Sequence, residues 1–302
     1  MTNSSVILLA GGTGLIGTRM AEILRKKGYQ IRMLTRSPKG ENDYFWNPVA
    51  GEIDLKALEG VHAIVNLAGA GIAEGRWTDA RKKLLIESRV QCANVMAKAI
   101  VSMPEKPKVY LSASAVGFYG NSGEAWMSEN AAPVDDSFMV DCCQQWETAA
   151  AQMESLGLRT AIFRIGVVMT KEGGALAEIL RPLKLGIGGY FGDGQAWWSW
   201  IHREDVCGAF IWGIEQDTIS GIFNLVAPTP VRGKNLVQTL VKVRKMPALV
   251  LPVPAFALQL ALGEMSAVVL NSNRVSAQKL LDAGFKFQFP TLDAAFQDIF
   301  AR

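Results

Sequence analysis

The stretch Ala10-Gly11-Gly12-Thr13-Gly14-Leu15-Ile16-Gly17 decides the fold of this chain of 302 residues. It follows an apolar run, Val6–Leu9, that is typical of a buried strand, and it precedes a segment with helical spacing, Thr18–Lys27. Glycines at 12, 14 and 17 satisfy GxGxxG, and those at 11, 14 and 17 satisfy GxxGxxG. A plain glycine turn is the alternative interpretation. The strand before and the helix after the turn favour a dinucleotide-binding fingerprint.

Such a turn would hold the phosphates of a dinucleotide on the N-terminus of the helix, where free N–H groups and the helix dipole attract an anion. We expect the cofactor to contact Gly11, Gly12, Thr13, Gly14, Leu15, Ile16 and Gly17. The next expected strand ends Leu34-Thr35-Arg36-Ser37, with no Asp or Glu for the ribose 2′-OH of NAD. Arg36 offers a fixed positive charge, and Ser37 a hydroxyl, to a 2′-phosphate. The sequence therefore predicts NADP(H) over NAD, with a surface arginine at a strand end as the alternative.

Outward from this turn, short β-rich runs alternate with amphipathic segments, the pattern of right-handed βαβ units around a parallel sheet. Strands are expected at Val6–Leu9, Gln30–Leu34, Ala63–Leu67, Lys108–Leu111 and Thr160–Ile165. Helices are expected at Thr18–Lys27, Thr78–Ile100 and Asp141–Ser155. The predicted fold class is α/β: a Rossmann-type doubly wound parallel sheet with a smaller, mostly helical C-terminal lobe.

The chain changes character after Ile165, where many glycines surround an expected helix, Leu176–Leu185. It is then expected to return to the sheet through His202–Trp212 and Ile222–Val226. The most apolar stretch, Val250–Leu270, contains two prolines and two polar residues, which predicts a buried helix with a proline-rich entry. We expect an NADP-binding domain over 1–170, with 200–232 returning to it. A substrate-capping lobe would comprise 171–199 and 233–302.

Composition limits the classes of partner. The chain is 49% hydrophobic and has a net charge of +3 from 31 basic and 28 acidic residues, which argues against nucleic acid or an anionic membrane as partner. We expect a small-molecule partner and a monomer or homodimer. The four cysteines form no CxxC pair and no metal-ligand spacing occurs, so reduced thiols and no metal are expected. No signal peptide precedes the first strand, so a cytoplasmic location is expected.

A group of basic residues around one expected helix is interpreted as solvated surface, with a phosphate or partner contact as the alternative. The group consists of Arg232, Lys234, Lys242, Arg244 and Lys245.

Three motifs follow one another along the chain: Gly11–Gly17, Asn66-Leu67-Ala68-Gly69 and Ser112-Ala113-Ser114-Ala115-Val116-Gly117-Phe118-Tyr119-Gly120. In this order they resemble an extended short-chain dehydrogenase of the NAD-dependent epimerase/dehydratase superfamily. Five further segments are similar to its atypical, epimerase-like branch, which includes a human member and bacterial proteins often labelled cell-division inhibitor. These are Ser88-Arg89-Val90, Trp146-Glu147, Trp198-Ser199-Trp200-Ile201-His202, Leu251-Pro252-Val253-Pro254 and Arg274-Val275. The resemblance adds cofactor contacts from Leu67, Ala68, Gly69, Ser112 and Arg164 to those expected above.

In a typical member of that family, the Tyr of a YxxxK motif transfers a proton while the Lys lowers its pKa and holds the ribose. If Glu147 is aligned with the glutamate that commonly follows this lysine, the Lys position falls on Cys143 and the Tyr position on Met139. Neither residue can perform that chemistry, because methionine has no exchangeable proton and a neutral thiol has no fixed charge. No tyrosine or lysine lies between Gly120 and Gly157, so a shifted alignment does not restore the pair.

Other residues are candidates for the site. Ser114 is expected to face the substrate, although a structural turn role is the alternative and the family's Ser/Thr can also fall on Ala115. Tyr119 is a second candidate, with a structural role as its alternative. His202 can titrate near neutrality and donate a proton, or it can cap the helix that follows. The substrate pocket would be lined by Trp198 and Trp200, which can equally fill a core.

Two functions are consistent with these residues. The first is an NADP-dependent oxidoreductase or epimerase-like enzyme that acts on an unknown small molecule without the usual dyad. The second is a binding protein that senses the NADP/NADPH ratio and reports it through closure of the lobe. A role in cell division rests on a family label alone, and nothing in these residues explains it.

Overall fold

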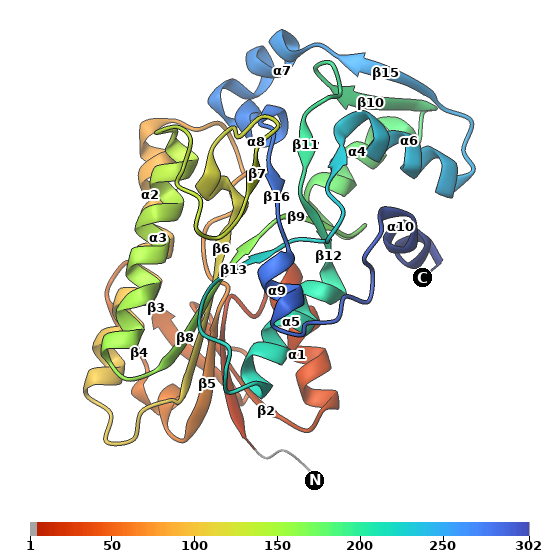
Figure 1. The fold of residues 1–302 in the computed structure, drawn as a ribbon. Coiled ribbons are helices and arrows are strands. Elements are labelled where there is room, and N and C mark those ends of the chain that lie inside the picture. Colours follow the sequence, from red (N-terminus) through yellow and green to blue (C-terminus); the bar gives the residue numbers. More distant parts are fainter. Residues whose placement is uncertain (1–4, 302) are drawn as a thin grey trace.

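An eight-stranded sheet forms the centre of the molecule in the computed structural model, which describes residues 5–301 (Figure 1). Its strands lie in the order β13-β8-β6-β5-β1-β2-β3-β4. They are β1 (Val6–Ala10), β2 (Gln30–Thr35), β3 (Asp43–Asn47), β4 (Glu52–Ile53), β5 (Val61–Asn66), β6 (Val109–Ala115), β8 (Arg159–Ile165) and β13 (Gly221–Leu225). Neighbours are parallel except β3 and β4. The predicted doubly wound parallel sheet is confirmed, and its switch point lies between β1 and β5, where such sheets bind ligands.

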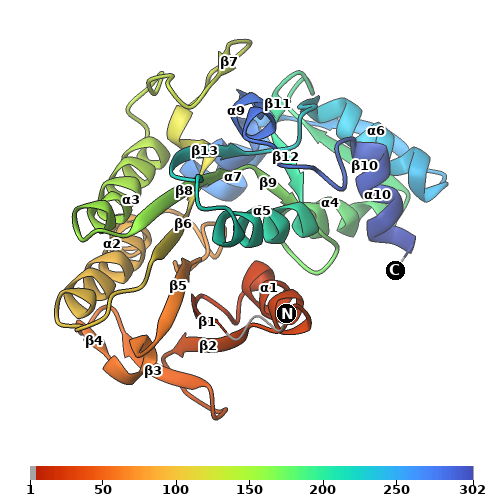
Figure 2. The same ribbon diagram turned by 60° about the horizontal axis from the view of Figure 1, so that its bottom comes forward.

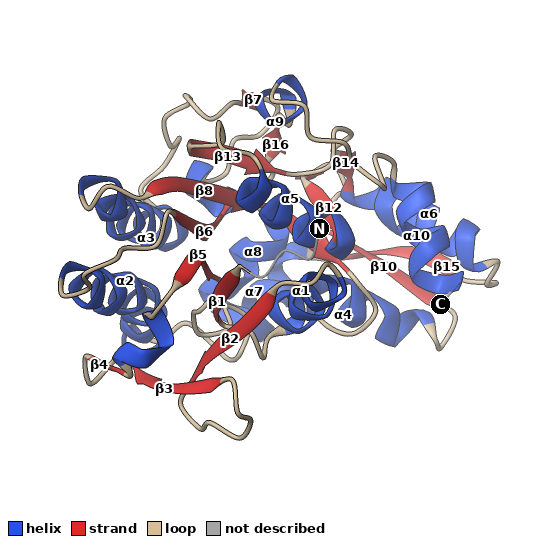
Figure 3. Cartoon of the chain, turned by 90° about the horizontal axis from the view of Figure 1, so that it is seen from below, coloured by secondary structure: helices blue, strands red, loops and turns tan. Residues whose placement is uncertain are grey.

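Helices cover both faces of this sheet. Seen from below, α2 (Asp79–Val101) and α3 (Phe138–Ser155) lie on one side of the row of strands, and α1 (Leu15–Lys26) and α5 (Arg203–Glu215) on the other (Figure 3). Because side chains alternate along a strand, neighbouring residues of β1 belong to different cores. Leu8 packs with the α2–α3 core and Leu9 with the α1–α5 core. Burial of both faces explains why the central strands read as continuous apolar runs.

The lobe has its own core and lies to one side of the sheet, and it carries the last helix of the chain (Figures 1 and 2). Its strands are β9 (Val167–Met169), β10 (Ile187–Phe191), β11 (Trp197–Trp198), β12 (Trp200–His202), β14 (Val231–Arg232) and β15 (Leu249–Val253). Its helices are α4 (Gly174–Leu183), α6 (Gly233–Arg244), α7 (Ala255–Leu262), η3 (Gly263–Ser266), α8 (Ala267–Leu270) and α10 (Leu292–Ala301). The remaining elements are η1 (Leu55–Leu58), η2 (Val116–Tyr119), β7 (Trp126–Met127), β16 (Arg274–Val275) and α9 (Gln278–Asp282).

The chain returns to the sheet as one helix packed on its face and one edge strand. Ile222–Val226 corresponds to β13, which pairs with β8 at the edge of the sheet. His202–Trp212, in contrast, is no strand of that sheet, because β12 pairs with β9 and the chain then becomes α5. The acidic residues Glu204 and Asp205 lie in the first turn of α5, where the helix dipole favours negative charge.

The expected buried helix over Val250–Leu270 is wrong. Pro252 and Pro254 confine the start of this stretch to β15 and its turn, and α7 follows without a single buried residue. Among residues 5–301, no helix has both the length and the apolarity needed to cross a membrane.

Candidate cofactor and active site

The glycine-rich turn after β1 is packed so closely that two of its glycines cannot be replaced. Gly11 has a φ of +77°, and a Cβ there would lie 2.7 Å from the carbonyl carbon of Leu67. A Cβ on Gly17 would lie 2.3 Å from the carbonyl oxygen of Gly11. Both neighbours are backbone atoms and cannot move aside as a side chain can. The turn therefore has the tight backbone geometry that the fingerprint requires.

The N-terminus of α1 is open to an anion. Gly14 is the N-cap of α1, and no described side chain caps the helix. The first turn of α1 contains no acidic residue. Thr13 and Gly14 are exposed, and Leu15 and Ile16 are half-buried. The first N–H groups of a helix have no partner within the helix, so they are available to a phosphate.

The end of β2 provides the expected cation. Arg36 and Ser37 are exposed, and the Ser37 N–H donates to Thr35 Oγ1 at 3.2 Å. Arg32, the other arginine of this strand, is used elsewhere because its Nη1 donates to three carbonyls of the η1 region, including that of Glu59 at 2.6 Å. Arg36 is thus the arginine of this segment whose position suits a 2′-phosphate.

The loop after β5 lies directly against the glycine-rich turn. The Leu67 N–H donates to the Ala10 carbonyl at 2.9 Å, and the Ala68 N–H donates to Asn66 Oδ1 at 3.2 Å. A Cβ on Gly69 would lie 3.1 Å from Cγ of Arg89. The structure therefore brings together the predicted contacts from Gly11–Gly17 and Leu67–Gly69 at the carboxyl ends of β1 and β5.

Ser114 lies in a buried ionic network on the α3 side of the sheet. Its hydroxyl donates to Glu147 Oε1 at 2.6 Å. Arg164 pairs with the same carboxylate through Nε and Nη2, each at 2.8 Å. The side chains of Arg164 and Glu147 are only 2% and 8% exposed. The Ser114 hydroxyl is therefore held by a carboxylate that accepts its hydrogen bond. Ser112 is fully buried, and its hydroxyl donates to the Ala113 carbonyl.

Arg164 requires a correction. The resemblance assigns it to the cofactor, but its third donor, Nη1, goes to the Tyr119 hydroxyl at 2.9 Å and the Glu129 carbonyl at 3.3 Å. Its guanidinium carbon also lies 3.4 Å from the centroid of the Phe118 ring. These contacts leave Arg164 inside the protein, where it links β8 to α3 and η2.

Tyr119 belongs to the same network. Its hydroxyl accepts from Arg164 and donates to Asn224 Oδ1 at 2.7 Å, and its side chain is fully buried. Burial raises the pKa of the Tyr119 phenol. The Asn224 amide nitrogen in turn donates to the carbonyl of Ser276 at 3.1 Å. Tyr119 therefore has the structural role that was the alternative to catalysis.

The positions of the missing dyad are apolar. A Cβ on Gly117 would lie 2.8 Å from Cε of Met139 and 3.8 Å from Sγ of Cys143, so both side chains lie against the backbone that follows β6. Cys143 is 1% exposed, and burial raises the pKa of its thiol well above the usual range. Met139 packs with Trp77 in a small cluster. No group here can replace a proton-donating Tyr/Lys pair.

His202 lies elsewhere, between α5 and α10. Its Nδ1 accepts the Glu204 N–H at 3.2 Å as the N-cap of α5, and its Nε2 lies 3.5 Å from Asp298 Oδ2. Its ring packs on Phe289 with centroids 4.1 Å apart. The helix-capping alternative for His202 thus describes what the structure shows, and the histidine does not join the Ser114 network.

The two tryptophans expected in a substrate pocket lie in the core of the lobe. Trp200 is fully buried and its indole donates to the Thr229 carbonyl at 2.9 Å. Trp198 is 6% exposed and stacks on Phe191 with centroids 6.1 Å apart. Both indoles fill space between the elements of the lobe, which corrects the expectation that they line an open pocket.

Comparisons with known proteins agree with this architecture. The model of the NAD dependent epimerase/dehydratase family matches residues 7–225, and a domain of unknown function, DUF1731, matches residues 253–299. The chain is 34% identical to the epimerase family protein YfhF of Bacillus subtilis, over 98% of each chain. It is 35% identical to the epimerase family protein SH2119 of Staphylococcus haemolyticus, over 97% of this chain and 98% of the relative.

A solved structure has the same fold over almost the whole length. The human epimerase family protein SDR39U1, crystallised with NADPH, superposes with a TM-score of 0.90 and 31% identity, over 97% of this chain and 98% of the human one. The family match covers the glycine-rich turn, the loop after β5 and the network of Ser114, Glu147 and Arg164. This chain belongs to the NAD dependent epimerase/dehydratase family.

Proposed function

We propose that this chain binds NADP(H) at the carboxyl ends of β1, β2 and β5. The observation that carries the proposal is the combination of Gly11 and Gly17, which allow a phosphate to approach α1, with Arg36 at the end of β2. The human relative, which was crystallised with NADPH, supports the choice of cofactor. In this arrangement the pyrophosphate contacts the first N–H groups of α1, and the 2′-phosphate contacts Arg36 and Ser37.

We further propose reductase- or epimerase-like chemistry on a small molecule, of a kind that needs no proton from a Tyr/Lys pair. NADPH, when bound, supplies a hydride to a carbon placed against its nicotinamide. The Ser114 hydroxyl donates a hydrogen bond to Glu147, and the Tyr119 hydroxyl donates one to Asn224. Neither hydroxyl therefore points its hydrogen at a substrate. Two substrate classes suit this site: an iminium, which becomes a neutral amine on hydride addition without any proton, and a conjugated carbonyl compound, whose enolate takes its proton from water.

A specific contact favours the second candidate function, a sensor of NADP(H). The loop from Leu67 to Thr78 begins at the expected cofactor contacts and ends at the N-cap of α2. Near its end it contacts the lobe, because Arg76 Nη2 donates to the carbonyls of Leu260 and Ala261 at 2.6 and 3.0 Å. A ligand that orders the start of this loop would also stabilise its contact with α7. Hydrogen exchange of α7 with and without NADPH measures this coupling, and a sensor requires slower exchange in the complex.

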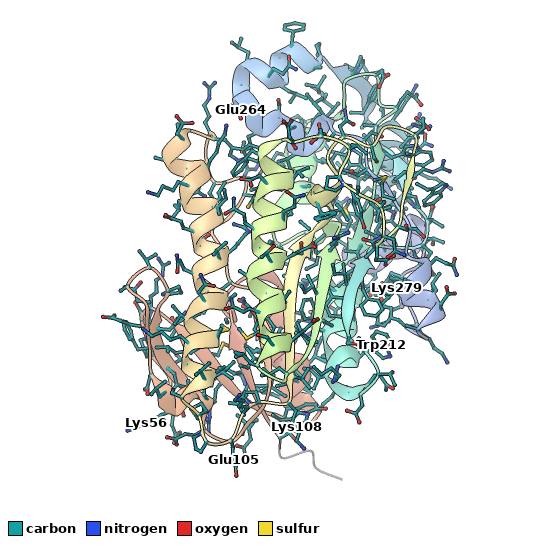
Figure 4. All side chains as sticks on the ribbon, turned by 60° about the vertical axis from the view of Figure 1, so that its left-hand side comes forward. Lys56, Glu105, Lys108, Trp212, Glu264 and Lys279 are labelled. Carbon is teal, nitrogen blue, oxygen red and sulfur yellow. The ribbon has the colours of Figure 1, made fainter. Side chains whose placement is uncertain are left out.

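The cofactor assignment is tested by titrating the purified chain with NADPH and NADH. Arg36→Asp should weaken NADPH binding by about 10- to 100-fold, because a charged hydrogen bond to phosphate is replaced by repulsion, and should leave NADH binding almost unchanged. Lys108→Asp is the control, since Lys108 is exposed at the opposite end of the sheet (Figure 4). Equal losses for both dinucleotides would refute the assignment to Arg36. Turnover of a panel of iminium and conjugated carbonyl compounds, followed as loss of NADPH, distinguishes the reductase from the sensor.

A further inference from the structure

The outer side of the lobe carries large apolar side chains that residues 5–301 leave exposed. Phe256 and Leu260 of α7 are 72% and 78% exposed, and Leu185 before β10 is 82% exposed. We use the term lobe apolar face for six residues: Leu185, Ile187, Leu249, Leu251, Phe256 and Leu260. A monomer rarely exposes large apolar residues together, and when it does the patch marks an interaction surface.

The fold places these residues together although they are far apart in sequence. β10 and β15 pair in parallel, with Ile187 opposite Leu249. The next residue of each strand, Gly188 and Val250, faces α6, because a Cβ on Gly188 would lie 3.1 Å from Val237 Cγ1. Alternation then turns Ile187 and Leu249 to the outside.

The same ribbon leads into α7 along the rim of the lobe (Figure 1). Phe256 and Leu260 are four residues apart, so they lie on one side of α7. Lys82 pairs with Glu264 just beyond the helix, and Met265 packs with Trp77. The end of α7 is thereby fixed to the sheet domain while its apolar side chains stay exposed.

The two segments that carry this face have charges of one sign. Residues 179–192 and 218–263 contain no Asp or Glu, although the chain has 28 acidic residues. Lys184 and Lys245 are exposed and precede the parallel strands β10 and β15, so they lie at the same end of the ribbon, beside Leu185. The remaining cations of these segments are Arg181, Arg232, Lys234, Lys242 and Arg244. The apolar side chains are thus bordered by positive charge.

This charge pattern selects the occupant. A second copy of the chain would offer these lysines no anion from the same two segments, because residues 179–192 and 218–263 contain none. An anionic partner gains from them instead. Exposed apolar side chains on a ribbon and a helix, bordered by lysines, have the features of a surface that lies in a lipid headgroup layer. We infer that the lobe apolar face binds an anionic membrane surface peripherally, with Phe256 and Leu260 inserted and Lys184 and Lys245 at the headgroups.

The test is flotation of the full chain with phosphatidylcholine vesicles, with and without phosphatidylglycerol. The chain should float with the anionic vesicles only, and high salt should weaken its binding. Phe256→Ser together with Leu260→Ser should reduce binding at least about tenfold, because two apolar side chains leave the interface. Lys184→Glu together with Lys245→Glu should give a similar loss.

Matched controls lie at the other end of the molecule. Lys56 is exposed in η1 (Figure 4), and Val101 is 62% exposed at the end of α2. The variant Val101→Ser with Lys56→Glu should therefore bind vesicles like the unchanged chain. All variants change exposed residues, and equal melting temperatures establish that they fold. Absence of flotation by the unchanged chain overturns the inference. Self-association of the unchanged chain that is abolished by Phe256→Ser together with Leu260→Ser also overturns it. Binding to an acidic polypeptide but not to vesicles overturns it as well.

Discussion

Replacement of Glu147 by glutamine should destabilise the chain by about 3–5 kcal/mol, because it leaves a buried guanidinium without its anion. Arg164 is 2% exposed in its side chain and makes two hydrogen bonds of 2.8 Å to the carboxylate. Glutamine keeps the shape and its oxygen can still accept from Ser114, but its NH2 group would face an N–H donor of Arg164, so both the charge and one hydrogen bond are lost. For a chain of this size the loss corresponds to a shift of about 1 M or more in the urea midpoint.

The assay is urea unfolding followed by tryptophan fluorescence, with Glu87→Gln as the control. Glu87 is on the exposed side of α2 and lies 3.8 Å from Lys83, so its replacement should cost less than about 1 kcal/mol. The double variant Glu147→Gln with Arg164→Met should recover part of the loss, since no buried charge is then left unpaired. A Glu147→Gln midpoint equal to that of Glu87→Gln would refute a dominant role for this ion pair.

Two further predictions concern the turn and the thiols. Gly17→Ala should abolish NADPH binding, because its Cβ would lie 2.3 Å from the Gly11 carbonyl oxygen. Gly208→Ala is the control, since the nearest atom to its Cβ would be 3.8 Å away, and it should bind NADPH normally. Titration of both variants with NADPH tests this. Burial raises the pKa of Cys92 and of Cys207 to about 12, so the folded chain should resist iodoacetamide at pH 8 and react in urea. Mass spectrometry that finds either cysteine alkylated in the folded chain would contradict this burial.

The N-terminal half of the fold could be predicted from the sequence because its signals are local. All five expected strands occur in the sheet, and the turn from Gly11 to Gly17 joins β1 to α1 as its spacing requires. The helix over Thr78–Ile100 occurs as α2, where the Thr78 side chain accepts the Arg81 N–H and caps the helix. Such caps and periodic runs depend on neighbours in sequence, so they can be recognised without the fold.

The buried network could not be predicted in the same way. Glu147, Arg164 and Asn224 come from α3, β8 and β13, and only the packing of α3 on the sheet makes them partners. In sequence a glutamate and an arginine indicate surface, since charged residues are almost never fully buried unless they are paired. The resemblance gave Glu147 a place in an alignment, but its role as the anion of Arg164 and the acceptor of Ser114 depends on the tertiary structure.

The structure also changes what Ser114 and Trp200 imply about function. A serine at the end of β6 and a cluster of tryptophans suggest a substrate pocket when they are seen in sequence alone. In the structure, Ser114 fixes α3 through Glu147, and Trp200 donates to Thr229 inside the lobe. Both residues are accounted for by folding, so their presence does not by itself favour an enzyme over a sensor. Turnover has to be argued from the cofactor and the apolar site of Met139 and Cys143.

The exposed side of the lobe shows why whole-chain averages mislead. A net charge of +3 suggests an even surface, yet residues 218–263 contain no acidic residue. The expectation that the chain does not bind an anionic membrane was based on that net charge. The expectation of a buried helix over Val250–Leu270 was based on the mean apolarity of that stretch. Pairing of β10 with β15 gathers Ile187 and Leu249 on one face and brings Lys184 and Lys245 to one end of the ribbon. Segregation of charge and apolarity arises from this pairing, and a membrane surface responds to the local pattern rather than to the sum.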